Sequence, residues 1–375
     1  MIQGIGAYTF TWVISCLLLF YEYQHVNNIG HNFEEKNCYW SKKKISLIVV
    51  VIISAFFSLY NYYVTIASSV TGGDRQNYIL NFNGVRATPS IGLGAIMKLV
   101  HLIGGNIMVL YCFTTFFCVF ITLIAYRESE DATPYAFYLL CLTQYFLATL
   151  TALKQCYASA FAVLFFVLMI EKNTKKSRII SGICVIIACL FHSTGFILIP
   201  LFFLLKSKRQ EKVIVLYFLM LLIIALFFKP IMIMAGTILS PVIPSLGAKI
   251  SEYFIVSNDT TEGIAVSFLK GMPYYFIIFL GSIERNKLVG KIKNYDKYLI
   301  VCLTGAFLYL VSLYSAWFNR FIYFFNFAFC IFFGKIIEGL CLRENKMVYN
   351  FVLQSCLIFI TYRFLYLIYS LYGGF

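Results

Sequence analysis

The dominant feature of the chain is a series of long, continuous apolar runs separated by short polar segments. A membrane-spanning helix needs roughly 20 apolar residues in succession. Runs of about that length lie near 5–20, 45–66, 106–125, 134–150, 154–171, 213–229, 264–282, 299–315, 321–340 and 350–371. Strands of a β-barrel alternate in hydrophobicity over about ten residues. The pattern therefore predicts an all-α, polytopic integral membrane protein that forms a single transmembrane domain over residues 1–375.

A further apolar run, 179–205, is interrupted by FHSTG at 191–195 and by Pro200. It is compatible with one long helix or with two short ones that meet at His192. Cytoplasmic loops carry an excess of Lys and Arg. With two helices, 20 of the 30 Lys and Arg residues fall on one side and seven on the other. We therefore expect about 12 transmembrane helices, with both termini outside the cytoplasm.

This topology assigns the connecting segments to two sides of the membrane. The predicted cytoplasmic loops are about 21–44, 172–178, 206–212 and 283–298. The predicted extracytoplasmic loops are about 67–105 and 230–263. The first of these contains a mildly amphipathic stretch over 91–102, and the second contains three prolines and is expected to be partly irregular.

Composition excludes the competing classes of protein. Hydrophobic residues make up 61% of the chain and charged residues 12%, whereas an average soluble domain has about 25% charge. The net charge of +14 does not indicate a nucleic-acid partner, because Lys and Arg cluster between apolar runs, as topology requires. There is no P-loop, DxD sequence, His pair or Cys/His cluster, so we expect neither a metal nor another cofactor.

Polar residues on the predicted outer side are not explained by topology, which disfavours positive charge there. They come from distant parts of the chain but fall at one membrane level. These residues are Asp74, Arg75, Arg86, Lys154, Gln155, His192, Lys270, Asn319, Arg320 and Arg363. Polar groups at such a depth are costly unless they are paired or face a wet cavity. Their convergence predicts one outward-facing polar cavity.

The chemistry of this set suits an anionic ligand such as a phosphate or diphosphate, since it holds several cations and few acids. Asp74 and His192 are the plausible proton acceptors. A carboxylate near Arg stays ionised, and histidine titrates near neutrality. Either group is able to take a proton from a hydroxyl that attacks an activated carbon. Because no nucleotide motif is present, a substrate already activated on a lipid is expected.

Each cation also has a purely structural interpretation. Arg75 pairs with Asp74 in that view, and Lys154 extends from a helix end to the lipid headgroups. His192 becomes a turn histidine that bonds a helix-end carbonyl, and Arg320 becomes an interfacial anchor. The set as a whole is more specific than any member.

Four local patterns carry a resemblance to a known family. They are GGDRQNY at 72–78, KQCYA at 154–158, FHSTG at 191–195 with Pro200 after it, and NRF at 319–321. In order and spacing they resemble the G-x-D-x-x-x-Y, R-Q-x-x-A, F-H-S and polar-Arg segments of the EpsG-like branch of the Wzy-type polysaccharide polymerases. Lys154 stands where that family usually has Arg, which replaces a bidentate fork with a point charge.

The resemblance implies a metal-independent glycosyltransferase of the bacterial cytoplasmic (inner) membrane, with its active site facing outward. Such enzymes join undecaprenyl-diphosphate-linked oligosaccharide repeat units into a surface polysaccharide: O-antigen, capsule or exopolysaccharide. Membrane lipid, a chain-length regulator and other polysaccharide-assembly proteins are the implied partners. Arg75, Lys154 and Arg320 would then stabilise the departing diphosphate, and His192 or Asp74 would deprotonate the acceptor hydroxyl. Supporting contacts to the substrate are expected from Gln155, Tyr78, Asn319, Arg363 and Lys270.

Other classes of protein remain in the comparison. A polysaccharide ligase, or another glycosyltransferase with a lipid-phosphate-sugar donor, shares most of this chemistry and stays open. A lipid-oligosaccharide flippase or transporter would place polar residues at mid-membrane, whereas here they cluster at the outer level. An acyltransferase would rely on His192 alone and leave the cations unexplained. The patterns favour the polymerase.

Overall fold

The computed structural model describes the chain over 46–67, 74–87, 90–129, 152–172, 174–206, 210–241, 264–290, 292–312 and 319–344, with isolated residues between 9 and 20, at 244 and 247, and between 347 and 365. Within these ranges every regular element is a helix. The all-α prediction is therefore confirmed for the described part of the chain.

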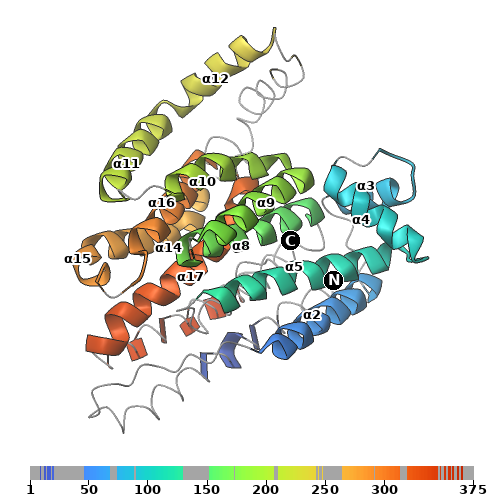
Figure 1. Ribbon diagram of the computed structural model, residues 1–375, viewed down its shortest axis with the longest axis horizontal. Coiled ribbons are helices and arrows are strands. Elements are labelled where there is room, and N and C mark those ends of the chain that lie inside the picture. Colours follow the sequence, from blue (N-terminus) through green and yellow to red (C-terminus); the bar gives the residue numbers. More distant parts are fainter. Residues whose placement is uncertain are drawn as a thin grey trace.

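The helices follow the predicted apolar runs closely (Figure 1). In chain order they are α2 (Leu47–Ala67), α3 (Arg75–Phe82), α4 (Ile91–Leu102), α5 (Ile107–Glu128), α8 (Leu153–Val167), the π-helical turn η1 (Leu168–Lys172), α9 (Lys175–Phe191), the 3-10 turn η2 (Ser193–Ile197), α10 (Leu198–Lys206), α11 (Gln210–Leu226), α12 (Phe228–Leu239), α14 (Ile264–Ile283), α15 (Arg285–Leu288), α16 (Tyr295–Ser312) and α17 (Asn319–Glu344).

Three of the described helices are long and apolar enough to cross a membrane: Ile107–Glu128, Leu153–Lys172 and Tyr295–Ser312. Shorter apolar helices accompany them, so the described part of the chain has the character of a membrane protein. The number of about 12 spans stays a prediction. The predicted span 134–150 lies outside the described residues, and 5–20 and 350–371 lie largely outside them.

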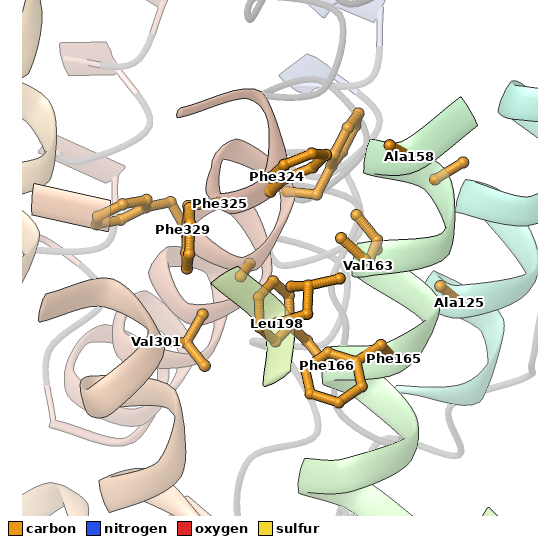
Figure 2. Packing of buried hydrophobic residues seen from close by; sticks show 14 of the residues in the cluster. Ala125, Ala158, Val163, Phe165, Phe166, Leu198, Val301, Phe324, Phe325 and Phe329 are labelled. Carbon is orange, nitrogen blue, oxygen red and sulfur yellow. The ribbon is translucent and has the colours of Figure 1, made fainter. Parts of the chain in front are cut away.

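Helix α8 is at the centre of the bundle and contacts α5, α9 and α17. Its sequence explains this position, because small side chains such as Ala158, Ala160 and Ala162 let neighbouring backbones approach closely. Figure 2 shows Phe166 of α8 near Phe325 of α17, with ring centroids 5.5 Å apart. The core is thus built around one helix that is buried along most of its length.

The ambiguous run 179–205 forms two helices, not one. A capping box of Thr174 and Ser177 starts α9, and the helix ends where His192 adopts an extended conformation. After η2, α10 contacts η1, the turn that directly precedes α9 in the chain. The chain therefore reverses at His192, as the distribution of Lys and Arg favoured.

The predicted irregular loop 230–263 begins as a regular helix. Helix α12 occupies Phe228–Leu239 and projects with α11 from one end of the bundle (Figure 1). Pro230 lies in the first turn, where the missing N–H of proline costs no helical hydrogen bond. The prolines therefore did not prevent helix formation in this part of the segment.

Charged side chains are paired inside the bundle at the η1 end of α8. The Nζ atom of Lys335 lies 2.8 Å from Oε1 of Glu171, and the two side chains are 1% and 0% exposed. The Tyr298 hydroxyl donates to the same carboxylate, and Lys297 Nζ lies 3.4 Å from the Met169 carbonyl oxygen. This cluster joins η1, α16 and α17.

Two further ion pairs flank this cluster. Lys172 Nζ lies 2.7 Å from Glu128 Oε2, and Arg285 binds Asp296 with two N–H groups at 3.1 Å each. The sequence assigned the basic residues among them only a role in topology. The structure shows that they also hold helix ends together.

The buried pair generates a stability prediction. Changing Lys335→Met leaves the Glu171 carboxylate buried without its cation, which should cost about 3–5 kcal/mol and lower the melting temperature of the detergent-purified protein. The double change Glu171→Leu with Lys335→Leu should recover most of the loss, since neither charge remains. Lys206→Met, at the exposed end of α10, is the control. Equal melting of Lys335→Met and the control would contradict the pairing.

Candidate functional site

A cavity lies between α3 and the start of α8, at the end of α8 opposite the buried ion pair. Its volume is about 280 Å³, and it is lined by Asp74, Asn77, Tyr78, Asn81, Arg86, Ala87 and Lys154. Positions 74, 77, 78 and 81 share one face of a helix by their spacing. Ligand pockets for small molecules span roughly 300–1,000 Å³, so this cavity suits one compact group.

Asp74 stands at the entrance to this helix with its carboxylate uncommitted. It is the N-cap residue of α3, yet its side chain makes no capping hydrogen bond. It is exposed and has no hydrogen-bond or ion-pair partner among the described residues. A carboxylate in this state is available to a ligand.

The short helix α3 is held from two sides. Tyr78 is 2% exposed, and its hydroxyl lies against the backbone of Lys154. Burial, and then the charge of Asp74, raises the pKa of Tyr78 above its usual range, so the phenol stays neutral. Arg75 is buried, with its guanidinium 5.7 Å from the Tyr111 ring centroid on α5. Arg75 therefore anchors α3 and does not line the cavity.

The FHSTG segment positions His192 through close packing on both sides. The Phe191 ring stacks on Tyr157 with centroids 4.3 Å apart. It also lies so close to Gly92 that a Cβ there would be 2.9 Å from the ring. A Cβ on Gly195 would be 2.8 Å from the backbone of Ala188. Only a glycine lets η2 fold back onto α9 at this distance.

His192 has a defined proton arrangement. Its Nδ1 accepts a hydrogen bond from the backbone N–H of Thr194 at 3.2 Å, and the Thr194 hydroxyl lies 2.6 Å from the same nitrogen. Because a backbone N–H only donates, Nδ1 carries no proton. The neutral ring therefore has its hydrogen on Nε2 and offers it as a donor.

Charged groups from four separate segments act on one another around His192. Burial lowers the pKa of His192 to about 4, and the positive charges of Lys154 and Arg320 contribute to the shift, while Asp74 opposes it. Lys154 also interacts electrostatically with Asp74 and with Arg320. The structure thus brings Asp74, Lys154, His192 and Arg320, from α3, α8, the α9–η2 connection and α17, near enough to influence one another.

These outer groups differ from the charges at the η1 end of α8. Among the residues that the structure describes, neither Lys154 nor Arg320 forms an ion pair with Asp74, and neither has another charged partner within bonding distance. In the ion pairs at the η1 end of α8, the nitrogen and oxygen atoms lie 2.7–3.1 Å apart. The outer arrangement leaves its cations free to meet an anionic ligand.

Comparison with protein-family models matches residues 44–374 to the EpsG family. The chain belongs to the EpsG family. This family is associated with polysaccharide polymerases of the glycosyltransferase type. No curated protein and no solved structure matches the chain.

The patterns that pointed to the EpsG family lie at the site in three dimensions. GGDRQNY supplies Asp74 and Tyr78, KQCYA starts α8 with Lys154, and FHSTG forms the break at His192. The fourth pattern places Arg320, which is exposed, in the first turn of α17.

The other predicted site residues either lie away from the cavity or have side chains outside the described part of the structure. Gln155 is buried in α8 beside Lys154 and does not line the cavity. Lys270 and Asn319 belong to α14 and to the start of α17, but their side chains lie outside what the structure describes. Arg363 lies outside the described residues. Roles for these residues stay predictions.

Sequence reasoning missed two asparagines of this cavity. Asn77 and Asn81 line the cavity, and Arg86 Nη1 donates to Asn77 Oδ1 at 2.8 Å. Their signal was the spacing of polar residues after Asp74, which puts them on the same face of a short helix.

The electrostatic convergence predicts an unusual titration of His192. Hydrogen–deuterium exchange at the histidine C2 position, followed by mass spectrometry across pH, reports this pKa directly. The midpoint should lie near 4, well below the ordinary value of 6.5. Lys154→Met or Arg320→Met removes a positive charge and should raise the midpoint, whereas Asp74→Asn should lower it. A midpoint near 6.5 that none of these changes moves would contradict the assembled site.

Proposed function

We propose that this EpsG family protein is a glycosyltransferase that polymerises oligosaccharide repeat units carried on undecaprenyl diphosphate. The observation that carries the proposal is the set of unpaired cations, Lys154 and Arg320, around His192 and beside the cavity that holds Asp74. Membership of a family of polysaccharide polymerases and the apolar helices support it. The bias of Lys and Arg favours an outward-facing site in the bacterial cytoplasmic membrane.

The reaction is a displacement at the anomeric carbon of the growing chain. A hydroxyl oxygen of the next lipid-linked unit forms a bond to that carbon, while the bond to the diphosphate oxygen breaks. The electron pair leaves with the diphosphate, and the hydroxyl proton passes to a base. The lipid diphosphate itself is the activating group, so the displacement needs no nucleotide.

Asp74 is the better candidate for the base. The Nδ1 atom of His192 already accepts hydrogen bonds, and its pKa of about 4 makes it a weak acceptor of protons at neutral pH. Asp74 has an uncommitted carboxylate at the cavity. We therefore assign proton acceptance to Asp74 and hydrogen-bond donation through Nε2 to His192.

Lys154, Arg320 and the Nε2–H group of His192 stabilise the charge that develops on the diphosphate. Such donors act most strongly when they are fixed before the reaction and shielded from water. Arg320 is able to bind two adjacent oxygens with its planar fork, while Lys154 supplies a point charge. Arg75 contributes indirectly, because it holds α3 against α5.

Deleting the gene tests the reaction class. Surface polysaccharide from the deletion strain should contain single repeat units and no long chains, since each unit is still made and exported but not joined. Gel electrophoresis of the polysaccharide as a ladder measures this. Long polymer that accumulates on the lipid carrier would instead indicate a ligase, and an unchanged ladder would exclude both.

Arg320 distinguishes diphosphate binding from membrane anchoring. An anchor needs only a cation on an apolar stem, so Arg320→Lys should be silent in that case. With a diphosphate ligand, Arg320→Lys should shorten the ladder markedly. Arg320→Ala should reduce the rate by a factor of about 100–1,000, by analogy with the loss of one oxyanion donor.

The variants are compared in the deletion strain at equal membrane abundance, so that misfolding is not read as lost catalysis. Arg343→Lys, in the last turn of α17 at the opposite end of that helix, is the matched control. Full-length ladders from both Arg320 variants would remove Arg320 from the site.

A further inference from the structure

The α3 cavity contains a buried amide that the fold does not use. Asn81 is 8% exposed and lines the cavity, and its side chain has no hydrogen-bond partner among the described residues. Buried polar side chains are nearly always hydrogen-bonded, because an unmade bond in a buried place is costly. The Asn81 amide is not among the fully enclosed polar atoms that lack a partner, so what exposure it has is to the cavity that it lines. A ligand that enters the cavity is therefore in place to complete its hydrogen bonds.

Asn77, one helical turn before Asn81, has a fixed orientation. Arg86 donates to its Oδ1 atom at 2.8 Å, which leaves the NH₂ group of Asn77 as a donor. Asn81 offers both a donor and an acceptor. Together with the acceptor Asp74, the cavity wall presents donors and acceptors side by side along one face of α3.

This mixture matches neighbouring hydroxyl groups better than it matches a diphosphate. Each sugar hydroxyl both donates and accepts, so it satisfies an amide and a carboxylate together. A diphosphate only accepts, so Lys154 would suit it, but it has no proton to offer the Asp74 carboxylate or the Asn81 carbonyl oxygen. Arg86, the other cation of the lining, already donates to Asn77. The volume of about 280 Å³ is also that of a compact single group, such as one sugar ring, and not of a whole repeat unit.

The arrangement of the cations separates two halves of the site. Lys154 and Arg86 line the cavity, and Lys154 also acts on His192. The charge of Arg320 acts on both Lys154 and His192. Neither Arg320 nor His192 lines the cavity. The groups proposed to bind the diphosphate, Lys154, Arg320 and His192, thus lie beside the α3 cavity, and Lys154 belongs to both.

We infer that the α3 cavity is the subsite for the acceptor sugar, and that Asn77 and Asn81 bind the hydroxyls of one ring so that another hydroxyl meets Asp74. This inference rests on the proposed function. It gives α3 a role in selecting the acceptor, because the positions of the two amides along the helix select which hydroxyl pattern fits. Arg86 stays with the cavity, where it donates to Asn77, and Arg320 is left to the donor diphosphate.

The test uses detergent-purified, full-length protein and two separate probes. One is the oligosaccharide repeat unit obtained by partial hydrolysis of the producing strain's own surface polysaccharide, and the other is inorganic pyrophosphate. Binding of each is measured by calorimetry, and the melting temperature of every variant is recorded. The polymer ladder of the same variants is followed in the deletion strain.

Asn81→Leu should weaken binding of the oligosaccharide by roughly tenfold, the equivalent of about one hydrogen bond, and leave pyrophosphate binding unchanged. Its melting temperature should equal or exceed that of the wild type, because a buried unpartnered amide is replaced by an apolar group of similar size. Asn81→Ala removes the amide without adding bulk and should show the same loss of binding. Gln76→Leu, on the exposed side of α3 and away from the cavity, is the matched control.

Two results would overturn the inference. One is oligosaccharide binding that is absent in the wild type or unchanged in both Asn81 variants. The other is a loss of pyrophosphate binding in those variants as large as the loss of oligosaccharide binding, which would make the cavity a diphosphate site. Failure of the proposed function looks different, because the deletion strain then still makes long polymer, as a normal ladder or on the lipid carrier, whatever the binding data show.

Discussion

One constraint shapes this structure: a charge inside an apolar bundle is costly unless it is paired or faces a polar space. The protein meets this constraint in two ways at the two ends of α8. Near η1, Glu171 and Lys335 neutralise each other at 2.8 Å. Near the start of α8, Lys154 stands beside a cavity without an ion-pair partner among the described residues. Paired charges hold the bundle together, and unpaired ones are available for chemistry.

Helix α8 connects these two ends. Lys154 and Glu171 are separated by roughly 25 Å at 1.5 Å per residue, which is close to the roughly 30 Å of a hydrocarbon core. The small residues between them allow α5, α9 and α17 to pack tightly around the helix. The position of Lys154 is therefore fixed by the core and by an ion pair at the far end, although it forms no ion pair of its own among the described residues. Such rigidity keeps a cation in place before its ligand arrives.

The apolar runs predicted most helix positions because hydrophobic length is a property of the local sequence. The reversal at His192 was also predictable, since the Lys and Arg clusters on either side of 179–205 favour two helices. The partners of Lys335 and Lys297 were not predictable, because they depend on which helices pack together. The same reason explains Asn81: its missing partner becomes visible only once α3 is placed against α8. The convergence of Asp74, Lys154, His192 and Arg320 was predicted from membrane level alone. The packing of Arg75 on Tyr111 was not predictable, because it depends on how α3 lies against α5.

The histidine motif shows how packing changes a chemical role. From residue type, His192 is a base that titrates near neutrality. In the fold, Gly195 lets η2 close onto α9, and this closure brings the N–H of Thr194 to Nδ1. The lone pair that a base needs is then occupied, and the nearby cations make protonation still less favourable. What remains is a neutral ring with one N–H to donate. In the proposed reaction the backbone turn thus makes His192 a hydrogen-bond donor, and the proton is assigned to the Asp74 carboxylate, which α3 leaves uncapped.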